Sequence, residues 1–169
     1  MERFCVLLGA LLLLSGCAAA EEQTWTLVGN TYENTAGGFG CSLEEGWVWV
    51  DPEETGLSML AENRETFSSI AVEQRPLSLW EQFPGQTSEE ALPFPRELPA
   101  EAVEREWVYV TFLGQPCTAL HTAARVEGVD YYLLQLFPAC AGGCRITLTL
   151  ACFLEDRTDA MLGLFYPLE

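Results

Sequence analysis

The cysteines are the residues of this sequence with the clearest capacity for chemistry. Two of them, Cys140 and Cys144, flank Ala-Gly-Gly in the segment PACAGGC, residues 138–144. Thiols so close together can bind a metal, act as a redox couple or close a disulfide across a turn. Glycines favour a turn, and residues opposed in a hairpin have Cα atoms about 4.5–5.5 Å apart, a separation that a disulfide can bridge. We therefore predict the tip of a hairpin here, with Cys140–Cys144 as a possible disulfide.

A competing pairing joins Cys117 to Cys140, and the connection between two predicted strands, 116–126 and 129–137, decides between them. A four-residue loop at 127–130 places Cys117 opposite Cys140. A two-residue turn at Glu127-Gly128 shifts the register by two and leaves these cysteines only diagonal. The sequence leaves both pairings open, together with free thiols.

Metal and catalytic sites have little support in the sequence. Zinc sites usually contain CxxC pairs or closely spaced histidines, whereas CAGGC has one residue too many and His121 is the only histidine. His121 is four residues from Cys117, about 13 Å along a strand, so we expect an ordinary strand residue. The motifs GxSxG, GxGxxG, HExxH and the P-loop are all absent. We predict no catalytic residue, no metal ligand and no cofactor.

The composition is strongly acidic and argues against nucleic-acid binding. The chain has 25 acidic and 8 basic residues, a net charge of −17, and all its basic residues are arginines. Proteins that bind nucleic acid need a basic patch that releases counterions. The paired acids of the sequence are typical of a solvated surface. Trp47 and Trp49 share one face of a predicted strand, which favours a place in the core over a ligand-stacking role.

The elements that must position these residues are mostly strands. Alternation and turn signals predict strands at 39–43, 47–50, 57–61, 67–73, 103–113, 116–126, 129–137 and 145–153. We expect a short helix at Ser78–Phe83, a proline-rich surface loop at 83–99, and a closing helix within 155–165. Asp156 or Thr158 would cap this last helix, and Met161, Leu162 and Phe165 would form its apolar face.

The N-terminus resembles that of a bacterial lipoprotein. Phe4–Leu14 is an apolar run too short to span a membrane, and Leu14-Ser15-Gly16-Cys17 resembles the lipobox that follows it. The resemblance implies a signal peptide at 1–16, a lipidated Cys17, a tether at 17–24 and a single domain at 25–169. It places the protein on the extracytoplasmic face of the cell membrane, held by its lipid. Five cysteines then remain in the domain, so at least one stays unpaired within the chain.

Three stretches of the domain resemble the PsbP-like domains of small bacterial lipoproteins. They are NTYENTAGGFGCSLEEGW, FLGQPCTALHTA followed by VEGVDYYLLQLF, and ITLTLACFLEDRTDAMLGLF. The resemblance implies an α+β fold in which a meander-rich antiparallel sheet packs against a few short helices. It also implies a binding or assembly role with a protein partner at the envelope, and it carries over no functional residue. Glu45 replaces the proline that usually precedes the Gly-Trp pair. The alternative is a thiol-redox or copper-handling lipoprotein that uses Cys140 and Cys144.

Overall fold

The computed structural model describes residues 24–50, 57–77, 100–141 and 143–169. Within these ranges the chain forms strands and a single five-residue helix. The elements are β1 (Trp25–Val28), β2 (Thr31–Asn34), β3 (Phe39–Ser42), β4 (Trp47–Trp49), β5 (Met59–Asn63), β6 (Ser68–Pro76), β7 (Ala100–Phe112), β8 (Gln115–Val126), β9 (Val129–Leu136), β10 (Cys144–Phe153), α2 (Thr158–Leu162) and β11 (Phe165–Pro167).

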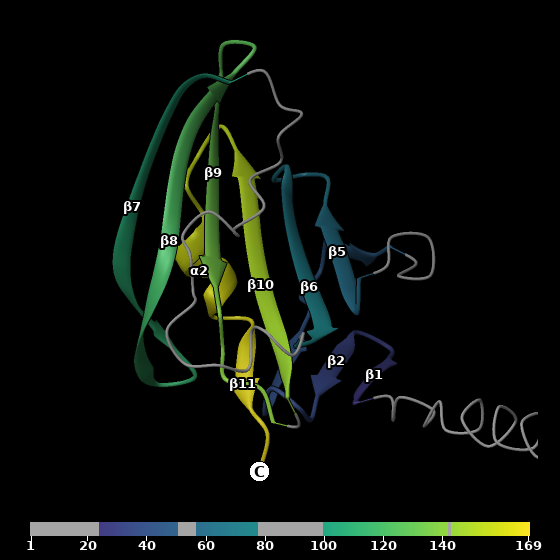
Figure 1. Ribbon diagram of the computed structural model, residues 1–169. Helices are drawn as coiled ribbons and strands as arrows, with labels where there is room; N and C mark the ends of the chain where they lie inside the picture. Colours follow the sequence, from purple (N-terminus) through teal and green to yellow (C-terminus); the bar gives the residue numbers. More distant parts are fainter. Residues whose placement is uncertain (1–23, 51–56, 78–99, 142) are drawn as a thin grey trace, which may run out of the picture.

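The larger sheet contains seven antiparallel strands in the order β4-β5-β6-β10-β9-β8-β7, which Figure 1 shows as a curved layer with β7 at one edge. The meander predicted over residues 103–153 is confirmed, because β7 to β10 lie inside this sheet. Two-residue turns join β7 to β8 and β8 to β9. Both turn residues have positive φ in each case, Leu113 and Gly114 in the first and Glu127 and Gly128 in the second. This is the type I′ geometry that matches the natural twist of a hairpin.

The smaller sheet has the order β1-β2-β3-β11 and covers part of one face of the larger sheet. The two sheets share one apolar core. Its members are fully or almost fully buried and come from both sheets and from α2: Tyr32, Phe39, Cys41, Phe165, Ile70, Val72, Leu134, Leu136, Ile146, Leu148, Leu150, Met161 and Leu162. A smaller cluster around Tyr131 and Leu133 lies apart from this core, on the opposite face because these residues alternate with Leu134 and Leu136 along β9.

A chain of buried polar side chains also ties the two sheets together. The Asn34 amide donates to Tyr32 Oη and to Gln74 Oε1, both at 2.9 Å, and Gln74 Nε2 donates to Thr24 Oγ1 at 2.7 Å. Tyr32 Oη and Ser58 Oγ are hydrogen-bonded at 3.0 Å. Among the described residues no buried side-chain nitrogen or oxygen lacks a partner. This satisfied network fixes how β2 sits on β6, because an unpaired buried amide would be costly.

The predicted α+β class with a few helices is wrong. In the described part of the chain the only helix is α2, and strands make up most of the remainder. Residues 25–28, 31–34 and 165–167, which carried no strand prediction, form three of the four strands of the smaller sheet. This sheet occupies the face that we expected helices to cover. The PsbP-like resemblance therefore led to the wrong architecture.

The closing helix is shorter than expected. It begins at Thr158 and ends at Leu162, and Phe165 belongs to β11 rather than to a helical apolar face. Short apolar runs fit a strand as well as a helix, and here β11 gains backbone pairing with β3, with Phe165 opposite Cys41. The predicted helix at Ser78–Phe83 and the proline-rich loop at 83–99 lie outside the described residues.

Candidate functional site

The CAGGC segment connects β9 to β10, as predicted for the tip of a hairpin. The structure joins Cys140 and Cys144 as a disulfide, with Cα atoms 5.6 Å apart. Gly143 has a φ of 74°, a left-handed conformation that favours glycine and lets the chain turn into β10. Neighbouring Ala139 and Ala141 are exposed, whereas Cys140 and Cys144 are partly buried and pack against the core. That this disulfide also forms in the cell stays a prediction.

The register of β8 and β9 bears on the competing pairing. Val126 faces Val129 across a two-residue turn, so the four-residue loop is absent and Cys117 lies only diagonal to Cys140. Cys117 is a free thiol, as are the buried Cys41 and Cys152. Burial raises the pKa of all three, that of Cys41 to about 12. Because the thiolate is the nucleophile, these three cysteines are unsuited to covalent catalysis.

His121 has a partner that its sequence neighbourhood does not reveal. Its Nε2 lies 3.0 Å from Asp156 Oδ2, and its ring stacks on Tyr132. Asp156 also accepts hydrogen bonds from the backbone nitrogen and hydroxyl of Thr158, at 3.1 and 2.7 Å. Burial by itself raises the pKa of the Asp156 carboxyl, but these hydrogen bonds outweigh it and the pKa is lowered. The N-cap of α2 is Arg157, without a side-chain cap hydrogen bond, so the prediction that Asp156 or Thr158 caps this helix is wrong. Asp156 instead bonds to Thr158 in the first turn and links it to His121 of β8.

The geometry around His121 does not extend to a metal centre. His121 lies opposite Leu134 of β9, and Cys140 is six residues further along the chain, roughly 20 Å in extended conformation. No group of three or more potential ligands from histidine, cysteine and acids occurs in the ranges that the structure describes. A copper role for Cys140 and Cys144 would therefore have to do without His121.

Trp47 and Trp49 pack against the core, partly buried, on the same face of β4. The indole nitrogen of Trp49 donates to the carbonyl of Gly29 at 2.8 Å. This bond anchors β4 to the β1–β2 turn and uses the polar atom that a ligand-stacking tryptophan could offer. The core role predicted for the pair is thus the one observed.

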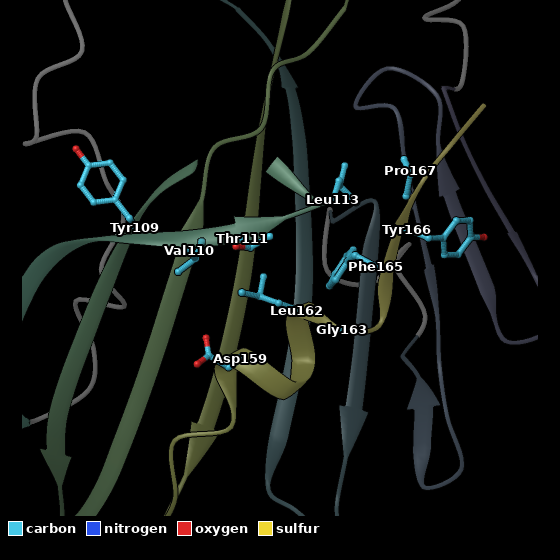
Figure 2. A pocket seen from close by; sticks show the side chains of 11 residues that line it. Tyr109, Val110, Thr111, Leu113, Asp159, Leu162, Gly163, Phe165, Tyr166 and Pro167 are labelled. Atoms are coloured by element: carbon cyan, nitrogen blue, oxygen red, sulfur yellow. The ribbon is translucent and has the colours of Figure 1, made fainter. Parts of the chain in front are cut away.

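The feature with the character of a binding site is an open cavity of about 640 Å³ between the end of β7 and the C-terminal segment. Figure 2 shows Val110 of β7 above Leu162 of α2, with Phe165 and Leu113 to one side and Asp159 below. Its lining comes from two distant stretches: Tyr109, Val110, Thr111, Leu113, Gly114, Asp159, Leu162, Gly163, Phe165, Tyr166 and Pro167.

The chemistry of this cavity is that of recognition. Its volume is in the range of ligand pockets, and its lining combines apolar and aromatic side chains with an exposed surface that is more polar than apolar. Asp159 is the one carboxylate among the lining residues, so paired acids for hydrolysis are missing from it. Burial, and then the negative charge of Glu33, raises the pKa of Tyr166, and the hydroxyl end of its ring packs over Gly40 of β3. No sequence motif marks these residues, and the sequence analysis did not predict them. The uncharged end of β7 is the one sequence signal that could have pointed to them.

Cys17 and the rest of the predicted signal and tether, residues 1–23, lie outside the described residues. Among the described residues α2 is the only helix, and with five residues it is too short to cross a membrane. No protein-family model matches the chain, and no curated protein matches it in sequence.

Proposed function

We propose that the protein is a lipid-anchored binding module on the extracytoplasmic face of the cell membrane. The observation that carries the proposal is the apolar run Phe4–Leu14 followed by Leu14-Ser15-Gly16-Cys17. Each CH₂ group of an acyl chain contributes about 0.8 kcal/mol of membrane binding, and two chains suffice for stable anchoring. The net charge of −17 repels an anionic membrane surface, but salt screens that repulsion within about 8 Å. The lipid therefore dominates and the domain faces outward.

The cavity between β7 and α2 supports binding as the activity of this domain. It combines apolar side chains with a few donors and acceptors, and the free thiols of the domain are held in unreactive form by burial. A protein partner at the envelope is the class that we propose. This class fits an anchored domain with a cavity that is open at its surface.

Metabolic labelling with palmitate, followed by membrane fractionation, tests the anchor. The wild-type chain should be labelled and should sediment with membranes, whereas Cys17→Ala should be unlabelled and should be released or left unprocessed. Cys5→Ser is the matched control, because it removes a thiol of the signal without touching the lipobox, and it should behave like the wild type. A Cys17→Ala chain that stays membrane-bound and normally processed would contradict the proposal.

A second candidate function is thiol redox or copper handling through Cys140 and Cys144. The observation that favours it is their disulfide, whose two cysteines are partly buried beside the exposed Ala139 and Ala141. Intact mass measured with and without reductant should differ by two hydrogens if the pair cycles. Copper titration of the reduced wild type against Cys140→Ser should show one equivalent lost. If the disulfide resists mild reductant and the reduced cysteines bind no copper, this second function is contradicted and the binding module is the only proposal that stands.

A further inference from the structure

Strand β7 forms one edge of the seven-stranded sheet along 13 residues. Among the strands that the structure describes, β8 is the only one that pairs with it. An edge strand of this length offers a row of backbone donors and acceptors to another chain. Natural proteins often protect such an edge with charges or prolines. In β7 the charged residues are confined to its first half, and residues 107–112, WVYVTF, contain neither a charge nor a proline.

The turn after β7 determines which backbone groups face outward. In a two-residue type I′ turn the flanking residues, here Phe112 and Gln115, form a hydrogen-bonded pair. Hydrogen-bonded and non-hydrogen-bonded pairs alternate along an antiparallel ladder, so Thr111 and Tyr109 direct their backbone groups away from β8. Pro116 lies opposite Thr111. Because proline has no N–H, its place at a non-hydrogen-bonded position agrees with this assignment.

The cavity of about 640 Å³ lies beside these outward groups. Tyr109, Val110 and Thr111 all line it although neighbouring side chains point to opposite faces of a strand. Figure 2 shows Tyr109 and Val110 diverging in this way. A cavity that contacts three successive residues follows the strand edge, and no residue of β8 lines it. The same holds for Phe165 and Tyr166, since β11 is the outer strand of the smaller sheet. The cavity thus lies between the outer strands of both sheets, as far as the described strands define them.

We propose that this edge binds an extended segment of a partner protein, which adds a strand to β7 and places alternate side chains in the cavity. The proposal rests on the binding function proposed above and names its partner class. Backbone pairing supplies affinity in such complexes, and side-chain pockets supply specificity. The segment should alternate basic residues with apolar ones, because Asp159 is the charged residue of the lining and the protein carries a net charge of −17.

A second copy of this chain is a weaker candidate for the same edge. Two copies each carry 25 acidic and 8 basic residues, so they repel, whereas a basic segment is attracted. In a self-paired dimer, residues 107–112 of one copy would lie beside Asp159 of the other. These residues carry no positive charge that could pair with that carboxylate. Charge complementarity therefore favours a basic partner.

The test uses the detergent-solubilised full chain and a fluorescent decapeptide of alternating Lys and Val, with binding measured by polarisation. Controls are the Glu–Val peptide and a Lys–Val peptide with N-methyl groups on alternate backbone nitrogens. Thr111→Pro removes one outward N–H and should weaken binding about tenfold, the value of one net hydrogen bond. Thr111→Val keeps that N–H and should bind like the wild type. Asp159→Asn should weaken binding about threefold, as for an exposed ion pair.

Equal binding to Thr111→Pro and Thr111→Val, or to the N-methylated and plain peptides, would overturn strand addition and leave only charge attraction. Binding of the Glu–Val peptide with equal affinity would overturn the basic partner. A dimer of the protein alone that Thr111→Pro abolishes would assign the edge to a second copy instead. None of these measurements depends on the lipid. The Cys17→Ala protein, released from the membrane, should therefore still bind the peptide, and this result would distinguish failure of the proposed anchor from failure of the proposed binding site.

Discussion

Strands β10 and β7 belong to the same sheet and both contain apolar, strand-forming stretches, yet they occupy opposite environments in the fold. Strand β10 is paired on both sides, and its Ile146, Leu148 and Leu150 are completely buried. Strand β7 is paired on one side by a described strand, and its Tyr109 is 86 % exposed. Both alternate β-branched, aromatic and aliphatic residues. The difference teaches that position in the sheet, not β-propensity, decides how deeply the side chains of a strand are buried.

Leu148→Ala should produce the largest effect and would test the role of β10. Leu148 is fully buried and lies between Leu136 of β9 and Val72 of β6. Removing its side chain from a closely packed core should lower the free energy of unfolding by about 2–5 kcal/mol. Denaturant unfolding measures the loss. The matched change on β7, Val108→Ala, affects a half-buried side chain and should cost less. A larger loss for Val108→Ala would reverse the comparison.

The disulfide at the start of β10 should contribute the next largest effect. The double variant Cys140→Ser, Cys144→Ser should lower the free energy of unfolding by about 2 kcal/mol, the chain-entropy value for so small a loop. The oxidised wild type treated with reductant should lose the same amount. Cys117→Ser serves as the control, because Cys117 is a free thiol and closes no loop. An unchanged unfolding midpoint in the double variant would show that the pair does not constrain the chain.

Asp156→Ala should destabilise the segment that follows β10 by about 1 kcal/mol, the value of one net hydrogen bond. Asp156→Asn keeps an oxygen acceptor for Thr158 and should cost less. The pKa of Asp156 is lowered in the folded state, so its contribution is complete above the ordinary aspartate pKa of about 3.9 and is lost as the pH falls through the folded value. Unfolding measured from pH 7 to pH 2 should therefore show a smaller acid-induced loss in Asp156→Ala than in the wild type.

Tyr109→Ser should have the smallest effect on stability and would sharpen the role of β7. The side chain is exposed, and surface substitutions usually change the free energy of unfolding by less than about 0.5 kcal/mol. If the edge of β7 is a recognition site, the same variant should still weaken binding of the Lys–Val peptide. A variant that is clearly destabilised, with peptide binding intact, would instead give Tyr109 a structural role.

The sequence predicted the meander well and the closing helix poorly. Strands β7 to β10 are long, alternate regularly and end at glycine-containing turns, and all of this is local information. The closing helix was overestimated because Met161, Leu162 and Phe165 fit helical spacing, while pairing with Cys41, over a hundred residues away, draws Phe165 into β11. The strands β1 and β2 are four residues each. Such short segments depend on long-range pairing, which alternation within one segment cannot report.

By itself the sequence determined the acidic charge, the spacing of Cys140 and Cys144, the strands of the meander and the resemblance of residues 14–17 to a lipobox, since each follows from residue type and near neighbours. Only the tertiary structure decided that Asp156 meets His121 and that Thr111 and Asp159 border one cavity. It also decided which strand lies at the edge of the sheet. These features arise where segments distant in the chain pack together, and that packing is a property of the whole core.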